Sequence, residues 1–82
     1  LNGSSINTDI FNLSELIESN VQLSKSTANQ KAIRFSYSIS SFTICWDRQI
    51  LNMVIRNLLA NAIKYSYHGG EINIYTKNDN GN

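Results

Sequence analysis

One stretch of the sequence carries polar side chains at a spacing that calls for an explanation. Residues 48–66 have the pattern of a helix, in which successive side chains turn by about 100° around the axis. On that helix Asn57, Asn61 and Lys64 share one face. An asparagine inside a helix costs about 0.5 kcal/mol relative to alanine. The set therefore indicates a function, the alternative being that both amides bond to neighbouring backbone or lie in water.

These side-chain types suit the binding of a metal ion and phosphate. An amide oxygen is a ligand for a hard cation such as Mg²⁺ and adds no negative charge beside phosphates. The ammonium group of Lys64 can contact a phosphate oxygen as a point charge. The apolar stripe of the same helix lies well over a quarter-turn away, and its predicted members are Leu51, Ile55, Leu58, Ala62 and, at the edge, Leu59.

The same stretch resembles a known motif. The N box in the ATP-binding domain of bacterial sensor histidine kinases has the form NLLxNAxKYS, which residues 57–66 resemble. The flanks at residues 47–51 and 69–72 also match, and the resemblance covers residues 11–75. It implies an α+β fold, a two-layer α/β sandwich of the Bergerat (GHKL) type. The sandwich would be incomplete, with two helices on one face of a mixed sheet.

The resemblance also implies the roles of four residues. In such kinases the second asparagine of the box coordinates a Mg²⁺ ion that bridges the ATP phosphates, and it matches Asn61. Lys64 would contact a phosphate, and Tyr65 would line the nucleotide site. Asn57 would orient the nucleotide or the catalytic water, a catalytic as well as a binding role. The implied cofactors are therefore ATP and Mg²⁺ in the complete domain.

Asn57 separates two kinds of reaction. Related ATPases of the superfamily, such as type II topoisomerases and mismatch-repair proteins, carry a glutamate there as the general base on water. An asparagine cannot abstract that proton, so the resemblance implies transfer of the ATP γ-phosphoryl group to a histidine in two-component signal transduction. The alternatives are a hydrolytic ATPase of the same superfamily and a nucleotide-free interaction module derived from it.

Other motifs of the resembling family are missing from the sequence. It contains no Asp-x-Gly-x-Gly motif for adenine, no phenylalanine box and no second glycine box. We expect residues 1–9 to be a linker from an upstream helical dimerisation domain and residues 10–82 to be the N-terminal portion of the ATP-binding domain. Alone, this fragment is expected to be inactive and to bind ATP weakly or not at all.

Composition limits the choice of partners. The 82 residues carry a net charge of +1 without a run of Lys or Arg, which argues against nucleic acid or an anionic membrane as the main partner. No apolar run approaches the length of a membrane span. The single Cys45 cannot form an internal disulfide and is predicted to be a small buried side chain. A cytoplasmic setting fits, with any anchor in the inner membrane lying outside this chain.

The expected protein partners follow from the resemblance. They are the upstream dimerisation domain that carries the phosphorylated histidine and the receiver domain of a response regulator. The only histidine here, His68, stands in a predicted turn rather than on an exposed helix and is not followed by an acid. We therefore expect the phospho-acceptor histidine to lie outside this chain.

The remaining pattern predicts the elements around the central helix. Residues 10–13 suit a short strand, and residues 15–32 suit a helix with Ser14 as its N-cap. Its apolar stripe would consist of Ile17, Val21, Ser24, Ala28 and Ala32, widened by Leu16 and Leu23. Residues 35–39 and 42–46 alternate with period two and predict a hairpin around residues 40–41.

The second half of the chain is predicted in the same way. Asp47 is expected to cap the central helix rather than to serve as a catalytic carboxylate, and Trp46 is expected to pack in the core rather than stack on a ligand. Residues 67–70 form a turn whose glycines permit positive φ. A strand follows at residues 71–77, and a hairpin turn is predicted at residues 78–81.

That last strand predicts association. One edge of the sheet would carry unpaired backbone groups, guarded only by Lys77. The missing half of the domain would also have covered apolar side chains of the sheet or of the face around Ile50 and Met53. We therefore expect the fragment to self-associate, the alternative being a loosely packed monomer.

Overall fold

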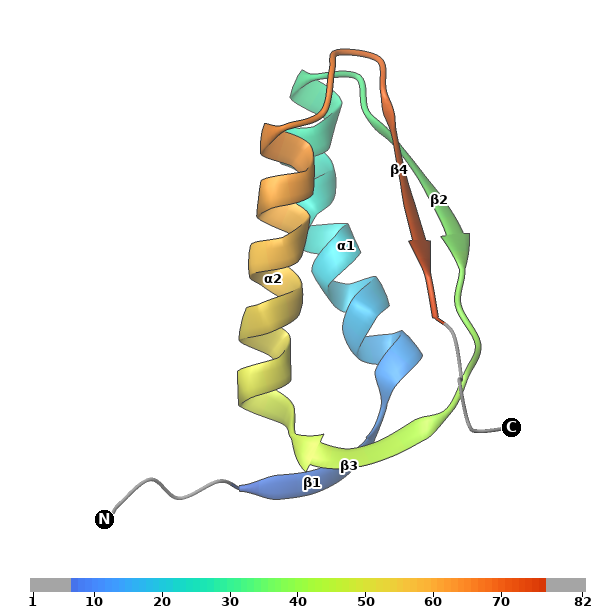
Figure 1. Cartoon of the computed structure of the whole chain (residues 1–82), viewed down its shortest axis with the longest axis vertical. Coiled ribbons are helices and arrows are strands. Elements are labelled where there is room, and N and C mark those ends of the chain that lie inside the picture. Colours follow the sequence, from blue (N-terminus) through green and yellow to red (C-terminus); the bar gives the residue numbers. More distant parts are fainter. Residues whose placement is uncertain (1–6, 77–82) are drawn as a thin grey trace.

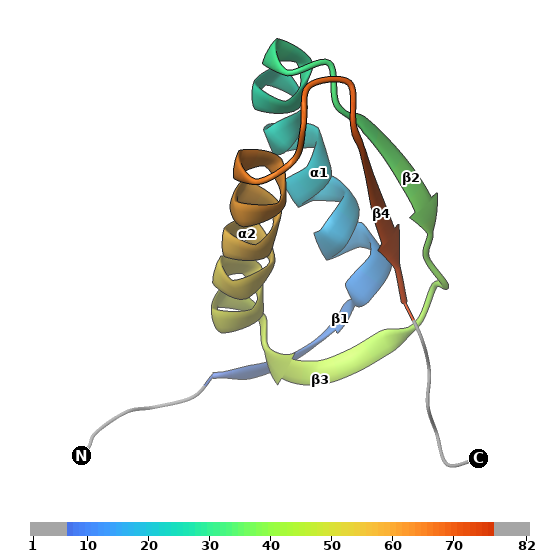
Figure 2. The same ribbon diagram turned by 45° about the horizontal axis from the view of Figure 1, so that its top comes forward.

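The computed structural model describes residues 7–76, and this part of the chain forms two helices and four short strands (Figure 1). Their order is β1 (Thr8–Asn12), α1 (Leu13–Gln30), β2 (Arg34–Ser38), β3 (Thr43–Asp47), α2 (Arg48–Lys64) and β4 (Glu71–Tyr75). The helices lie side by side, β2 and β4 run alongside them, and β1 and β3 cross one end of the pair (Figures 1 and 2). The predicted α+β class is confirmed.

The strands pair as two separate two-stranded sheets. β1 and β3 are antiparallel, with Phe11 opposite Ile44. β2 and β4 are parallel, with Phe35 opposite Ile72. Within residues 7–76 the two ladders share no strand, so the expected single mixed sheet is replaced by one parallel and one antiparallel pair.

The hairpin predicted around residues 40–41 is wrong. β2 and β3 are both strands, but each pairs with a segment far away in the sequence. Period-two alternation identifies a strand without identifying its partner, and Ser40-Ser41 lacks the turn residues that favour a tight hairpin. The connection instead carries the chain from one sheet to the other, and the backbone N–H of Ser40 donates to Oγ1 of Thr76, at 2.9 Å.

The start of α1 differs from the prediction by two residues. Asn12, not Ser14, is the N-cap, because its Oδ1 accepts hydrogen bonds from the backbone N–H groups of Ser14 (2.9 Å) and Glu15 (3.3 Å). Ser14 lies inside the first turn, and its hydroxyl also donates to Asn12. Either residue type can cap a helix, so composition alone does not choose between them.

Asp47 caps α2, as predicted. Its Oδ1 accepts from the backbone N–H of Ile50 at 3.1 Å, and its Oδ2 accepts from the backbone N–H of Asn7 at 3.1 Å. The side chain is buried, and its two oxygens join the end of β3 to the residue just before β1 and to the first turn of α2. This arrangement gives Asp47 a structural role.

The core lies between the helices and the β2–β4 pair. Val21 and Ala28 of α1 are fully buried, as is almost all of Ile63 on α2. A cluster of buried residues joins the layers and consists of Ala28, Ile33, Ile63 and Ile72, with Phe35, Ala62 and Ile74 packed against it. These contacts hold the second half of α2 against both α1 and the parallel strands.

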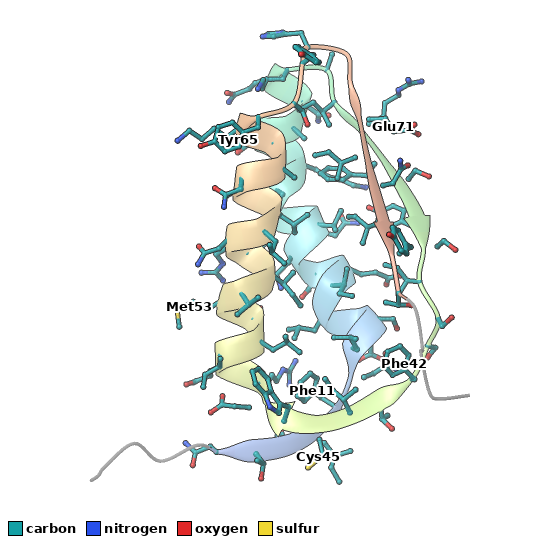
Figure 3. All side chains as sticks on the ribbon, viewed as in Figure 1. Phe11, Phe42, Cys45, Met53, Tyr65 and Glu71 are labelled. Carbon is teal, nitrogen blue, oxygen red and sulfur yellow. The ribbon has the colours of Figure 1, made fainter. Side chains whose placement is uncertain are left out.

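Five predictions of burial are wrong, and they concern Leu23, Ala32, Cys45, Trp46 and Leu58. Leu58 is 63% exposed, because the buried face of α2 centres on Leu59 and Ile63. Leu23 is 72% exposed, because the buried face of α1 does not include it. Trp46 is 46% exposed near the end of a two-stranded ribbon. Cys45 is exposed on the face of β3 turned away from the helices (Figure 3). Only one face of a two-stranded ribbon is covered, and the sequence pattern does not reveal which face that is.

The ends of the fold also correct two boundaries. β1 begins at Thr8, so Thr8 and Asp9 belong to the folded unit rather than to a linker reaching residue 9. α1 ends at Gln30, and Ala32 adopts a positive φ of 54° in the turn that follows. The hairpin turn predicted at residues 78–81 and the guarding Lys77 lie outside the described residues, as do residues 1–6.

Candidate nucleotide-binding face

The three polar residues of the central motif are exposed on α2, as their spacing predicts. Asn57, Asn61 and Lys64 all face solvent, whereas Leu59 and Ile63 of the same helix are buried. Among the side chains of α2, Asn52 hydrogen-bonds to Asn20 of α1. Within residues 7–76 the amides of Asn57 and Asn61 hold no other part of the chain. Both amides are therefore available to a ligand.

Tyr65 extends this face at the end of the helix. It follows the last helical residue, is 74% exposed, and projects on the side away from β2 and β4, as does Met53 (Figure 3). The Nζ atom of Lys64 lies 5.4 Å from the centroid of the Tyr65 ring, within cation–π range. The structure thus brings together Lys64 and Tyr65 and places Asn61 one turn before them.

Lys31, in the turn that follows α1, contacts the last turn of α2. Its Nζ atom donates to the backbone carbonyls of Ile63 (2.8 Å) and Lys64 (3.1 Å). Cations at a helix C-terminus offset the unsatisfied carbonyls and the negative end of the helix dipole. The backbone carbonyl of Lys31 also accepts from the N–H of Gly69, at 2.8 Å. Lys31 therefore fixes the segment that carries Lys64 and Tyr65.

Sequence reasoning did not identify Lys31, although one signal was available. A lysine in the turn after α1 suits the end of a helix. The helix whose end it caps is α2, however, which only the packing of the two helices determines.

The turn after α2 requires both of its glycines, for different reasons. Gly69 has a φ of +76°, a conformation that other residues rarely adopt. Gly70 has an ordinary φ, but a Cβ there would lie 2.9 Å from the carbonyl oxygen of Tyr67. The exposed His68 lies in this turn and not on a helix, as the sequence predicts.

The donor set suits Mg²⁺ bound together with phosphate. Within residues 7–76 no group of three or more His, Cys, Asp or Glu side chains is placed to hold a metal ion. The amide oxygens of Asn57 and Asn61 are exposed on one helix, and the ammonium group of Lys64 lies one turn further on. Neutral oxygen ligands beside a cation fit an ion whose other ligands are phosphate oxygens and water.

This helix pair over paired strands, with the N-box string on α2, has the fold of the cytoplasmic segments of sensor histidine kinases. The chain is similar to the cytoplasmic segment of histidine kinase QseC, with 26% identity and a TM-score of 0.80 over 87% of this chain and 48% of that one. The resemblance to sensor histidine kinases is thereby confirmed.

Two further structures share the fold. The Acinetobacter baumannii histidine kinase AdeS is 21% identical, with a TM-score of 0.84 over 94% of this chain and 39% of its own. The mycobacterial sensor histidine kinase MprB is 20% identical, with a TM-score of 0.80 over 89% and 48%. The chain thus spans about half of these structures or less.

No protein-family model matches the sequence, and no curated protein matches it. Neither helix in residues 7–76 is long and apolar enough to cross a membrane.

Proposed function

We propose that this chain, from β1 onward, is the first portion of the ATP-binding domain of a sensor histidine kinase and lies in the cytoplasmic part of that kinase. The observation that carries this proposal is the exposed face of α2. Asn57, Asn61 and Lys64 are aligned on this face, and their side chains are not packed in the core. A helix that used these side chains for packing would bury them or bond them to neighbouring backbone. The similarity to the QseC segment supports the same reading.

In this proposal each residue of the face acts on the nucleotide. Asn61 supplies a neutral oxygen to Mg²⁺, which when bound offsets the negative charge of the ATP phosphates. Lys64 contacts a phosphate oxygen, and its position depends on the carbonyl contacts that Lys31 makes to the end of α2. Tyr65 lines the nucleotide, and Asn57 orients it.

Asn57 favours phosphoryl transfer over hydrolysis. A carboxylate at this place could take the proton from an attacking water, but an amide has no such basicity. The proposed parent protein transfers the γ-phosphoryl group to a histidine of an upstream dimerisation domain. From there the group would pass to the receiver domain of a response regulator. The chain alone is expected to bind ATP weakly, because the residues that would read adenine are not in its sequence.

The test is an Asn61→Ala substitution in a parent protein that contains this chain. We expect autophosphorylation with Mg²⁺-ATP to be abolished while the folded state persists, since the side chain is exposed and holds nothing else. Asn29→Ala, an exposed asparagine on α1, is the matched control and should keep normal activity. Near-normal phosphorylation by Asn61→Ala would show that the metal role is wrong. A parent with the unchanged sequence that neither binds nor uses ATP would instead favour a nucleotide-free interaction module.

A further inference from the structure

A groove of about 360 Å³ lies between α1 and α2, beside the candidate nucleotide face. Both helices line it, and residues of the four strands do not. Its volume is within the range of small-molecule sites, about 300–1,000 Å³. Of the nucleotide-face residues only Lys64 borders this groove; Asn57, Asn61 and Tyr65 do not. The groove is thus a separate feature that shares one side chain with the face.

The apolar part of the groove is formed by Leu23, Ala60 and Ile63. Leu23 is a large apolar side chain left in contact with solvent, although α1 and α2 pack together beside it. Ile63 is buried at the base. A ligand with an apolar body would therefore remove Leu23 from water without moving the helices.

The polar part of the groove is entirely cationic or neutral. Lys31, Arg56 and Lys64 border it, and none of the described side chains that line it is acidic. An ammonium group has three donors, and Lys31 uses two on carbonyls of α2. The planar guanidinium of Arg56 matches the geometry of a carboxylate or phosphate. The charge complements an anion.

The walls of this groove are held by hydrogen bonds. Asn20, which lines it from α1, donates to Oδ1 of Asn52 on α2 at 2.7 Å. At the other end Lys31 joins the helices through the carbonyls of Ile63 and Lys64. A site whose walls are fixed in advance loses less entropy on binding than one that must form around the ligand.

We propose that this groove binds a small amphiphilic anion, with its carboxylate or phosphate head at Arg56 and Lys64 and its apolar body on Leu23 and Ala60. Occupation would draw Lys64 away from a nucleotide phosphate, so the two ligands would compete for that side chain. This consequence rests on the proposed function, whereas binding in the groove does not.

The test is a titration of the isotope-labelled chain followed by NMR, using four probes below any micelle-forming concentration. The probes are octyl phosphate, octanoate, n-octanol and inorganic phosphate. We expect saturable shifts at Leu23 and Ala60 with octyl phosphate, octanoate or both. The tighter of the two identifies the head group. Octanol and inorganic phosphate should bind at least about tenfold more weakly, because octanol lacks the anionic head and inorganic phosphate lacks the apolar body.

Two variants and a matched control assign the binding to this groove. Arg56→Gln should weaken binding about tenfold by removing a charge-assisted contact, and Leu23→Gln should weaken it by removing the apolar contact. Lys25→Gln removes the same charge from an exposed position of α1 outside the groove and should leave binding unchanged. All three sites are exposed, and the dispersion of the spectrum reports whether each variant is folded.

Three outcomes would overturn the proposal. The first is octanol binding as tightly as the anions. The second is a set of shifts centred not on Leu23 and Ala60 but on a separate apolar hollow lined by Leu58 and Ile74. The third is an equal effect of Arg56→Gln and Lys25→Gln. None of these outcomes bears on Asn61→Ala, so failure of the groove and failure of the kinase proposal are distinguishable.

Discussion

The Nδ2 atom of Asn20 donates a hydrogen bond to Oδ1 of Asn52, at 2.7 Å, across the interface between α1 and α2. Asn20 is only 2% exposed, and its Nδ2 also donates to the carbonyl of Leu16 at 2.9 Å. A buried amide is costly unless it is bonded, so this pair favours one relative position of the helices over others. That position brings Lys31 to the carbonyls at the end of α2.

We expect the two asparagines to be energetically coupled. Asn20→Ala and Asn52→Ala should each lower the free energy of unfolding, by about 1–3 kcal/mol for the buried Asn20. The double variant should be less destabilised than the sum of the two, with a coupling of about 0.5–3 kcal/mol. Urea unfolding of the four proteins measures this cycle, and Asn29→Ala serves as the exposed control. Strict additivity would show that the contact has no energetic role.

Replacing Lys31 should loosen the end of α2. Lys31→Met keeps the aliphatic stem but removes the ammonium group that contacts the carbonyls of Ile63 and Lys64. The expected cost is about 0.3–2 kcal/mol, the range for a cation at a helix C-terminus. Hydrogen exchange should accelerate at the backbone amides of Tyr65 and Ser66, which bond to carbonyls of that last turn.

The control for this prediction is Lys25→Met, which removes an equivalent charge from an exposed position in the middle of α1. It should leave exchange at Tyr65 and Ser66 unchanged. Unaltered exchange in Lys31→Met would mean that the turn after α2 holds the helix end without help from α1. Lys31→Arg should restore most of the protection, because a guanidinium can also reach two carbonyls.

Sequence patterns predicted the features that depend on neighbours along the chain. Asp47 follows a strand and precedes a helical run, which suffices to predict a cap. The exposed face of α2 follows from helical spacing alone. The pairing of β2 with β4, the exposure of Leu58 and the contacts of Lys31 and Asn20 all depend on which segments meet in three dimensions. No pattern within one segment contains that information.

Stability should fall at high pH through Tyr37. Partial burial, and secondarily the negative charge of Glu18, raise the pKa of Tyr37 above its ordinary value of about 10. Between about pH 10 and the higher pKa, the folded state therefore binds more protons than the unfolded state. Stability contributed by this group is present below that window and is lost as the pH rises through it.

Ring carbon shifts of Tyr37 followed by NMR give its pKa directly. Glu18→Gln should lower this pKa, because it removes the charge that opposes ionisation. Tyr37→Phe should reduce the loss of stability above about pH 10, measured by urea unfolding as a function of pH. A pKa of Tyr37 at or below that of a tyrosine in the unfolded chain would contradict this account.

The last prediction concerns association of the chain with itself. Leu58 faces solvent at the rim of an apolar hollow that Ile17, Ile55, Ile72 and Ile74 also line. Met53 and Val54 are exposed on the same helix. A large contiguous apolar surface is uncommon on a soluble monomer, and within residues 7–76 the parallel pair β2–β4 has no third strand at either edge. Contact with a second copy would cover Leu58 and its neighbours.

Light scattering coupled to size exclusion over about a hundredfold range of concentration measures this association, which mass action makes concentration-dependent. Leu58→Gln should shift the equilibrium toward monomer, because the substitution makes the exposed rim of the hollow polar. Leu23→Gln removes a comparably exposed leucine of α1, which lines the other groove, and should leave the equilibrium unchanged. A compact monomer with a sharp melting transition at every concentration would exclude association through this surface.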